Sequence, residues 1–180
     1  KRNRNVVISD CHLYHNNGIG IYFDHVNLHQ TNIANCHISY NGRGGIVIKE
    51  GGIYNVQISN CDIEDNVKSN NSSLANVLID MENGTIGELE ISGCTIQHGK
   101  DAPDSANIRM LGNTQQTVSF VVISGNFMSD INTNIHFNRV RSANISGNVF
   151  NECIEHDLLI ENSSNITIGS NVFELFDRNY

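Results

Sequence analysis

A chain of 180 residues is long enough for one domain with its own core, and its net charge of −8 excludes a nucleic-acid binder that tracks phosphates with clustered Lys and Arg. No run of about 18 consecutive apolar residues is present, so we expect no membrane-spanning segment. Asn makes up roughly one residue in six, Pro occurs once and Trp is absent, which favours short strands joined by tight turns over helices.

One kind of segment recurs seven times along the chain, each time as a short apolar strand followed by a turn residue. The strands contain Ile8, Ile33, Ile58, Ile91, Ile123, Ile145 and Ile168, and the turn residues are Cys11, Cys36, Cys61, Cys94, Asn126, Asn148 and Asn171. Spacings of 22 to 33 residues between equivalent positions are typical of a solenoid, in which each repeat forms one coil of the chain.

A second apolar strand follows each of the first six segments. These strands cover Ile21–Phe23, Ile46–Ile48, Val77–Ile79, Ile108–Met110, Ile135–Phe137 and Leu158–Ile160. Alternation along a strand turns Ile21 and Phe23 inward and Tyr22 outward. One repeat cannot bury its apolar side alone, whereas repeats stacked about 4.8 Å apart bury a continuous column of Ile, Val, Leu and Phe.

These patterns predict an all-β fold, a single-stranded parallel β-helix of about seven rungs with three short strands in each, over residues 1–180. The alternative, an antiparallel sandwich, does not explain why the same turn residue returns in phase. The repeat resembles that of the right-handed parallel β-helices of the pectate-lyase-like superfamily, which includes polysaccharide lyases, polygalacturonase-type hydrolases, mannuronan epimerases and phage tailspikes. The resemblance covers essentially the whole chain and implies the fold. It does not imply a particular activity, because the matching residues are core and turn residues.

The turn residues are expected to stack into an internal ladder. Asn suits a tight bend because it tolerates a left-handed backbone and its amide can bond the next rung, while Cys acts there as a small buried hydrophobe. The four cysteines of the column are therefore expected to be reduced, and Cys153 makes the total odd. A linear column without a C-x₂-C pair does not fit a zinc site. Asn16, Asn41 and Asn66 form a second expected ladder.

Chemistry is expected in the outward columns, because the core accounts for the inward ones. One column reads Tyr22, Val47, Leu78, Arg109, His136 and Leu159, and the next reads Asp24, Lys49, Asp80, Leu111, Asn138 and Glu161. Asp24, Lys49 and Asp80 fit an alternating-charge ladder. They also fit a catalytic site on a sugar, with Asp80 as the carboxylate, Arg109 as the stabiliser of substrate charge and His136 as the proton carrier.

Two long loops, around residues 64–76 and 98–107, are expected to wall a groove on this face. The expected substrate-binding residues are Tyr22, Lys49, Asp101 and Asp104. Asp101 or Asp104 would supply the second carboxylate of a hydrolase, or a calcium ligand if the chemistry is that of a lyase. No other cofactor is expected.

A second cluster, formed by His12, His37 and Asp62, is expected to face outward on consecutive rungs. Stacked His, His and carboxylate side chains can hold a divalent metal. Open stacking of polar side chains on a flat face is the interpretation that we favour, so no metal ligand is assigned.

Two functions remain open from the sequence. The first is a carbohydrate-active module that binds a polysaccharide or oligosaccharide and, if it is an enzyme, cleaves it as a lyase or glycoside hydrolase. The alternative is a non-catalytic rod of a tailspike, adhesin or surface protein, with an apolar contact column at Phe127, Val149 and Val172. We expect a secreted, cell-surface or virion-associated protein with neither nucleic-acid nor membrane partners, whose rods continue into flanking domains or further copies. Residues 1–5 show no apolar leader, so the chain is expected to be a fragment or a mature piece.

Overall fold

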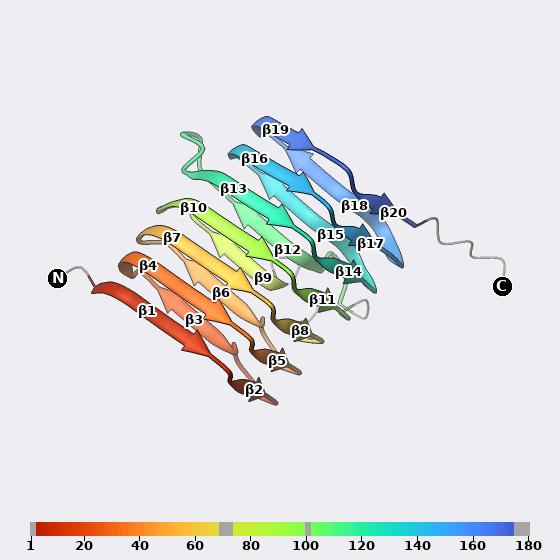
Figure 1. Cartoon of the computed structure of the whole chain (residues 1–180), viewed down its shortest axis with the longest axis horizontal. Coiled ribbons are helices and arrows are strands. Elements are labelled where there is room, and N and C mark those ends of the chain that lie inside the picture. The colour runs from red at the N-terminus through yellow and green to blue at the C-terminus, as the bar shows by residue number, and fades with distance from the viewer. Residues whose placement is uncertain (1–2, 69–73, 100–101, 175–180) are drawn as a thin grey trace.

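A computed structural model describes residues 3–68, 74–99 and 102–174. Over these residues it contains twenty strands and no helix, and the strands form three parallel sheets that wrap around one core (Figure 1). Within the same residues, no helix is long and apolar enough to cross a membrane. The predicted all-β parallel helix of about seven rungs with three strands in each is therefore confirmed.

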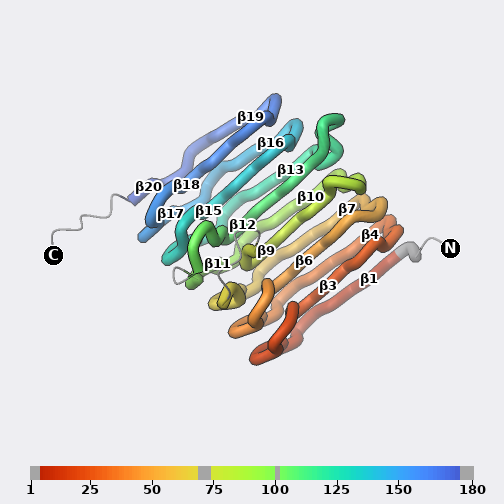
Figure 2. The backbone as a smooth tube through the Cα atoms, turned by 180° about the vertical axis from the view of Figure 1, so that it is seen from behind, coloured from red at the N-terminus to blue at the C-terminus, as the bar shows by residue number. Residues whose placement is uncertain are grey.

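Within the described residues, each rung contributes one strand to each sheet, except that the seventh rung, described only as far as residue 174, has none in sheet C. Sheet A contains β1 (Asn3–Ser9), β4 (Asn27–Ala34), β7 (Gly52–Ser59), β10 (Thr85–Ser92), β13 (Val118–Ser124), β16 (Val140–Ser146) and β19 (Ser164–Ile168). Sheet B contains β2 (His12–Tyr14), β5 (His37–Ser39), β8 (Asp62–Glu64), β11 (Thr95–Gln97), β14 (Phe127–Ser129), β17 (Val149–Phe150) and β20 (Val172–Phe173). Sheet C contains β3 (Ile21–Asp24), β6 (Ile46–Lys49), β9 (Ala75–Asp80), β12 (Ala106–Leu111), β15 (Ile131–Asn138) and β18 (Cys153–Glu161). The backbone tube in Figure 2 shows the coils following one another along the rod from the first rung to the last.

The core is a stack of inward-facing aliphatic side chains, one layer per rung. Ile33, Ile58 and Ile91 lie in register on neighbouring strands of sheet A and are fully buried. Ile38 and Ile63 do the same on sheet B. Because identical residues meet in adjacent rungs, each layer packs on the next with matching shape, which explains why the apolar positions of the repeat are so uniform.

Left-handed residues mark the corners of each coil. Between sheets A and B they are Asp10, Asn35, Asn60, Gly93, Gly125 and Gly147, and between sheets B and C they are His15, Tyr40, Asp65, His98, Asp130 and Glu152. The left-handed backbone was expected at the turn column itself, and that prediction is wrong by one residue, because the residue just before the column makes the bend. The column residue is thereby free to turn its side chain inward.

The turn column forms the predicted ladder. The backbone N–H of Cys61 donates to Cys94 Sγ at 3.4 Å, and the N–H of Cys94 donates to Asn126 Oδ1 at 2.9 Å. Asn126 Nδ2 donates to Asn148 Oδ1 at 3.0 Å, and Asn148 Nδ2 donates in turn to Asn171 Oδ1. The four cysteines of the column are free thiols, as is Cys153 outside it, and Cys36, Cys61 and Cys94 are buried as small hydrophobes.

A longer amide ladder runs through the corner between sheets B and C. Asn16, Asn41 and Asn66 are linked through their side-chain amides as predicted. The ladder then continues through residues that the sequence did not single out, in the order Asn66, Asn76, Asn107, Asn134 and Asp157. It ties six rungs together through hydrogen bonds that are buried over most of its length.

Candidate functional site

A cavity of about 370 Å³ opens on the outer face of sheet C, over its later rungs. Its lining consists of Asp104, Arg109, Leu111, Thr133, His136, Glu155, His156 and Leu159. Strands β12, β15 and β18 supply seven of these residues, and the loop that precedes β12 supplies Asp104. Parallel register places Arg109 beside His136 and His136 beside Leu159, so the floor of the cavity follows directly from the repeat.

Arg109 and His136 are locked together at the centre of this cavity. Arg109 Nε donates to His136 Nδ1 at 3.1 Å, and Arg109 Nη2 donates to the backbone carbonyl of Asp104. Since Nδ1 accepts a hydrogen bond, the proton of the neutral imidazole lies on Nε2, which donates to Glu161 Oε2 at 2.8 Å. The order Glu161–His136–Arg109 thus fixes both the orientation and the tautomer of the imidazole.

Burial acts on both ionisable groups of this pair. Desolvation lowers the pKa of His136 below its ordinary value, and the nearby positive charges of Arg109 and His156 lower it further, while Glu161 opposes them. Desolvation also lowers the pKa of the Arg109 guanidinium, against the pull of Asp104. Arginine nevertheless stays charged because its ordinary pKa is above 12, so the cavity holds a fixed cation next to a neutral imidazole.

The structure brings together some of the predicted site residues and not others. Arg109 and His136, from an outward column, meet at the cavity with Asp104, from the second long loop. Asp80 does not join them: it pairs in register with Leu111, its carboxylate accepts from the backbone N–H of Glu82, and it lies outside the cavity lining. The carboxylate bound to His136 is Glu161, from the last strand of the sheet.

Arg109 is also less accessible than its outward position implied. Only 6% of the residue is exposed, and its guanidinium lies against His136 and the Asp104 carbonyl of the preceding loop. An apolar cluster lies beside it on the outer face of sheet C, where Arg109 pairs in register with Leu78. That cluster is formed by Val47, Ala75, Leu78 and Ala106, with Ile19 and Leu111 against it. Alternation along a strand places Arg109 correctly on the outer face, but it cannot show that the loop before β12 reaches this side chain.

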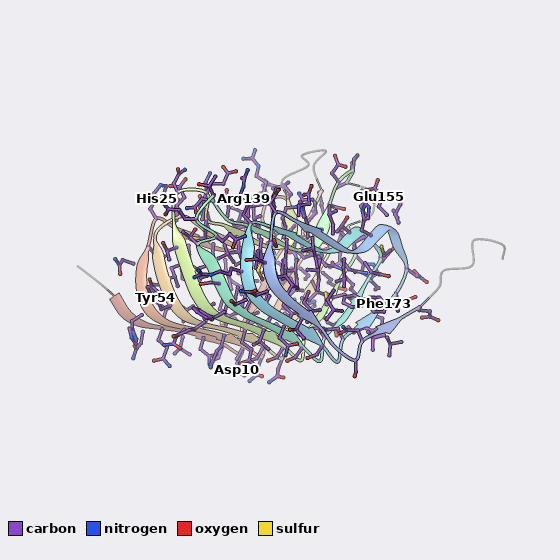
Figure 3. All side chains as sticks on the ribbon, turned by 90° about the horizontal axis from the view of Figure 1, so that it is seen from above. Asp10, His25, Tyr54, Arg139, Glu155 and Phe173 are labelled. Carbon is purple, nitrogen blue, oxygen red and sulfur yellow. The ribbon has the colours of Figure 1, made fainter. Side chains whose placement is uncertain are left out.

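The predicted substrate-binding residues Tyr22 and Lys49 lie at the other end of sheet C. Tyr22 pairs with Val47, and Lys49 lies between Asp24 and Asp80 in the register. Partial burial and the nearby charge of Asp24 raise the pKa of Tyr22. Figure 3 shows His25, which is bound to Asp24, near one end of this side of the rod and Glu155 near the other. Tyr22 and Lys49 thus belong to an acidic end that the apolar cluster separates from the Arg109 cavity. Asp101 lies outside the described residues.

The long loops line a hollow of their own at the corner between sheets B and C. This hollow, of about 410 Å³, is bordered by Tyr40, Asp65, Val67, Lys68, His98, Gly99 and Asp130. Lys68 Nζ lies 5.1 Å from the centre of the Tyr40 ring and 3.8 Å from Asp65 Oδ2. The expected wall of a groove is therefore present in part, but it encloses ion pairs at the corner. Of the loop residues that the structure describes, Asp104 alone lines the sheet C cavity.

Sequence reasoning missed a third hollow, which lies on sheet A. It measures about 380 Å³ and is lined by Tyr54, Thr85, Gly87, Glu88, Gln115, Gln116, Thr117, Ser119, Phe120 and Arg141. Tyr54 and Phe120 are both exposed there, and Phe120 has a left-handed backbone in the middle of β13. The available signal was Tyr54, an outward aromatic residue in β7, whose apolar residues Ile53, Val56 and Ile58 face the core.

The outer face of sheet B carries the second predicted cluster. His12, His37 and Asp62 are in register on β2, β5 and β8, and the two imidazoles stack with ring centres 4.4 Å apart. Glu64, two residues beyond Asp62, also reaches His37, which the sequence did not suggest. The stacking was predicted and the fourth residue was not.

Comparison with known families gives one match, to the family described as the right handed beta helix region, over residues 1–113. No curated protein and no solved structure matches the chain. The matched segment extends from the first rung through β12 and so includes Arg109, whereas His136 and Glu161 lie beyond it.

Proposed function

Since the chain belongs to the right-handed β-helix family, whose fold presents continuous outer faces, we propose that it is a carbohydrate-binding module that holds an acidic oligosaccharide in the sheet C cavity. The observation that carries the proposal is the buried Arg109 guanidinium at the centre of that cavity. A guanidinium binds a carboxylate through two parallel N–H bonds, and a uronate unit offers that group. A low local dielectric strengthens such a bond.

The rest of the lining suits a sugar that carries one carboxylate. Thr133 and His156 offer hydrogen-bonding groups beside Arg109, while Leu111 and Leu159 offer apolar surface to the C–H face of a ring. Among the described residues, His136 and the Asp104 carbonyl use only two of the five N–H donors of Arg109. The guanidinium can therefore engage a ligand without giving up the contacts that position it.

Binding is better supported than cleavage. A general base needs a free lone pair, but His136 Nδ1 accepts from Arg109 and Nε2 donates to Glu161. Proton transfer at His136 would require the Arg109 bond to break first. The carboxylates at hand for a hydrolase are Glu155, Asp104 and Glu161, in place of Asp80, and calcium enters only if the chemistry is that of a lyase.

The test is a binding titration with oligogalacturonates and with the same oligomers as methyl esters. The acidic form should bind and the ester should bind at least about tenfold more weakly, because it cannot form the charge-assisted bond to Arg109. Arg109→Met keeps most of the buried volume and should abolish the preference for the acid. Arg141→Gln removes a cation of the sheet A hollow and serves as the matched control, which should bind like the wild type.

Two further readouts separate the alternatives. A lyase releases an unsaturated uronate that absorbs in the ultraviolet, whereas a hydrolase releases only new reducing ends, and a binding module produces neither. Equal affinity for acid and ester, or undiminished binding by Arg109→Met, would contradict the proposal. A wild-type protein that binds no glycan of a broad panel would favour the non-catalytic rod, which the exposed apolar column at Phe127 and Val172 also supports.

A further inference from the structure

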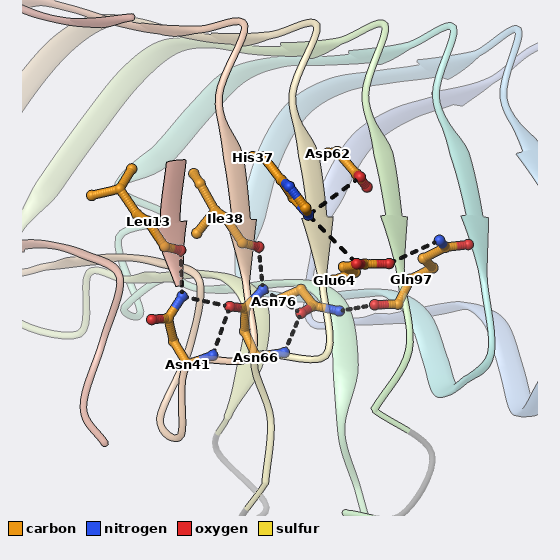
Figure 4. A network of polar contacts seen from close by, with 9 residues as sticks. All are labelled: Leu13, His37, Ile38, Asn41, Asp62, Glu64, Asn66, Asn76 and Gln97. Atoms are coloured by element: carbon orange, nitrogen blue, oxygen red, sulfur yellow. Dashed lines mark hydrogen bonds and ion pairs between the residues drawn. The ribbon is translucent and has the colours of Figure 1, made fainter. Parts of the chain in front are cut away.

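Three side chains that can each bind a metal ion, those of His37, Asp62 and Glu64, lie close together on the outer face of sheet B, away from the sheet C cavity. His37 on β5 points its Nε2 atom between the carboxylates of Asp62 and Glu64 on β8 (Figure 4). The ligand atoms of these three residues all lie within 4.8 Å of one another. Parallel register produces the arrangement, because β5 and β8 pair His37 with Asp62 and Ser39 with Glu64.

The spacing within this trio differs from that of a hydrogen-bonded histidine. His37 Nε2 lies 3.6 Å from Asp62 Oδ2 and 3.5 Å from Glu64 Oε1, so one nitrogen faces two carboxylates without bonding either. Elsewhere in the chain, His25 bonds Asp24 through Nδ1 at 2.6 Å and Glu50 through Nε2 at 2.7 Å. The ligand atoms of His37, Asp62 and Glu64 thus surround a common point, whereas His25 forms direct hydrogen bonds to its two carboxylates.

Unsatisfied atoms mark the same spot. His37 Nε2 and Asp62 Oδ1 are buried and have no hydrogen-bond partner, although His37 and Asp62 are partly exposed as residues. Ser39, on the same face of β5 as His37, is only 1% exposed, and its Oγ is also without a partner. Buried polar atoms are rarely left unpaired, and an ion is one of the groups that satisfies them.

We propose that His37, Asp62 and Glu64 bind a divalent transition-metal ion of the zinc type. Zinc bonds of about 2.0–2.2 Å in a tetrahedron put neighbouring ligand atoms about 3.3–3.6 Å apart, whereas an octahedron of that size would need about 3 Å. The distances from His37 Nε2 to Asp62 Oδ2 and Glu64 Oε1 match the tetrahedron, and all three ligand atoms lie within 4.8 Å of one another. Imidazole nitrogen favours zinc over calcium and magnesium, which take oxygen ligands. Three protein ligands leave a fourth position for water, the pattern of an open zinc site.

Neighbouring residues hold the ligands in place. Gln97 on β11 donates from Nε2 to Glu64 Oε2 at 3.3 Å, and Ser129 Oγ donates to Gln97 Oε1 at 3.4 Å. His12 stacks on the His37 ring from β2, the strand on the opposite side of β5 from β8. Burial and the adjacent carboxylate of Glu64 raise the pKa of Asp62, and a bound dication would offset both effects. This support corresponds to the outer shell that orients ligands in known metal sites.

The first measurement is calorimetric titration of zinc chloride into metal-free, fully reduced protein, with thermal unfolding as a second readout. Wild-type protein should bind one equivalent, and its unfolding midpoint should rise with zinc concentration. His37→Gln and Asp62→Asn should each lose both effects, and Gln97→Ala should weaken binding by about 10- to 100-fold. His25→Gln is the matched control, since it removes the other histidine placed between two carboxylates, and it should bind like the wild type.

Cobalt distinguishes this site from the cysteine ladder. Co²⁺ bound by one nitrogen and two oxygens shows visible bands without the near-ultraviolet charge-transfer band of a thiolate ligand. Circular dichroism of each metal-free variant establishes that the substitution leaves the fold intact. Zinc binding that persists in His37→Gln, a thiolate band in the cobalt spectrum, or a wild type that binds no zinc would overturn the assignment. None of these results depends on glycan binding, which concerns a different face.

Discussion

At the scale of single residues, His136 shows how two neighbours set the protonation of an imidazole. Arg109 donates to one ring nitrogen and Glu161 accepts from the other, so the partly buried ring is held in its neutral form. The unfolded chain therefore binds a proton at His136 more readily than the folded protein does. The consequence is a pH dependence that can be measured without knowing any ligand.

We expect the folded state to lose stability as the pH falls below 6.5. The pKa of His136 is lowered from 6.5 in the folded protein, so below that pH the unfolded chain binds the proton first. The contribution of neutral His136 to the stability of the folded state is complete above pH 6.5 and declines as the pH falls toward the lowered pKa of the folded protein. Urea unfolding over a pH series measures this slope, and His136→Gln should flatten it.

His25 provides the opposite case and serves as the control. Its hydrogen bond to Asp24 raises its pKa, so its contribution is present below 6.5 and is lost as the pH rises through the raised value. His25→Gln should therefore remove a decline in stability above pH 6.5 and leave the slope below 6.5 unchanged. An acid slope that His136→Gln does not change would show that other groups control the acid limb.

The five free thiols should differ sharply in reactivity. Cys11 is exposed, whereas Cys36, Cys61 and Cys94 are buried within the ladder. Burial, assisted by the charge of Asp157, raises the pKa of Cys153 to about 11, which leaves little thiolate at neutral pH. Brief alkylation of the native protein followed by mass spectrometry should label Cys11 first. Equal labelling of all five positions, or a disulfide within the ladder, would contradict the structure.

At the scale of elements, the amide ladder explains how rungs of unequal length stay in register. In the first rungs the side-chain amide of the ladder comes from the turn after sheet B, as at Asn41. Gly45, just before the next strand of sheet C, leaves room for the amide of Asn66, because a Cβ at Gly45 would lie 2.9 Å from Asn66 Nδ2. In the fourth rung the roles are exchanged, with Gly99 in the turn and Asn107 in the strand. The third rung contains both forms, Asn66 and Asn76, joined at 3.1 Å.

Asn107→Ala should be among the most destabilising single changes in the rod. Asn107 Nδ2 donates to the Ser129 carbonyl and to Asn134 Oδ1, and its Oδ1 accepts from Asn76 Nδ2. The substitution leaves several buried groups unpaired, at about 1–3 kcal/mol each, so we expect a loss of more than about 3 kcal/mol in unfolding free energy. Asn16→Ala, at the exposed end of the same ladder, should cost about 1 kcal/mol or less. Chemical denaturation measures both, and similar costs would refute the cooperative ladder.

The sequence predicts those parts of the fold that repeat in phase. The Ile positions, the Cys and Asn turn column, and the pairing of Arg109 with His136 all follow from the period. Asn76 was missed because it follows Asn66 by 10 residues where the earlier ladder steps are 25. The burial of Arg109 and the approach of Glu161 to His136 depend on how loops and long side chains pack over the sheet, which alternation along a strand does not encode.

At the scale of the whole molecule, the three sheets give the rod three chemically different sides. Sheet C carries the Arg109 cavity beyond an acidic end, and sheet B carries the His37 cluster in its early rungs. The later rungs of sheet B carry the apolar column Phe127, Val149 and Val172, whose register is as predicted. Phe127 and Val172 are 38% and 58% exposed, so this column leaves apolar side chains of sheet B in contact with water.

We expect this column to mediate self-association, with a second copy of the chain as the partner. An outward apolar row on a flat sheet gains free energy by covering an identical row, at about 25 cal/mol for each Å² of apolar surface removed from water. Sedimentation velocity over a range of concentrations should show a reversible shift to a larger species. Phe127→Asp places a charge in the centre of the row and should weaken this association by at least about tenfold. Asn144→Asp adds the same charge at an exposed position on sheet A and should leave the association unchanged. A wild type that sediments as a monomer at every concentration would exclude this role for the column.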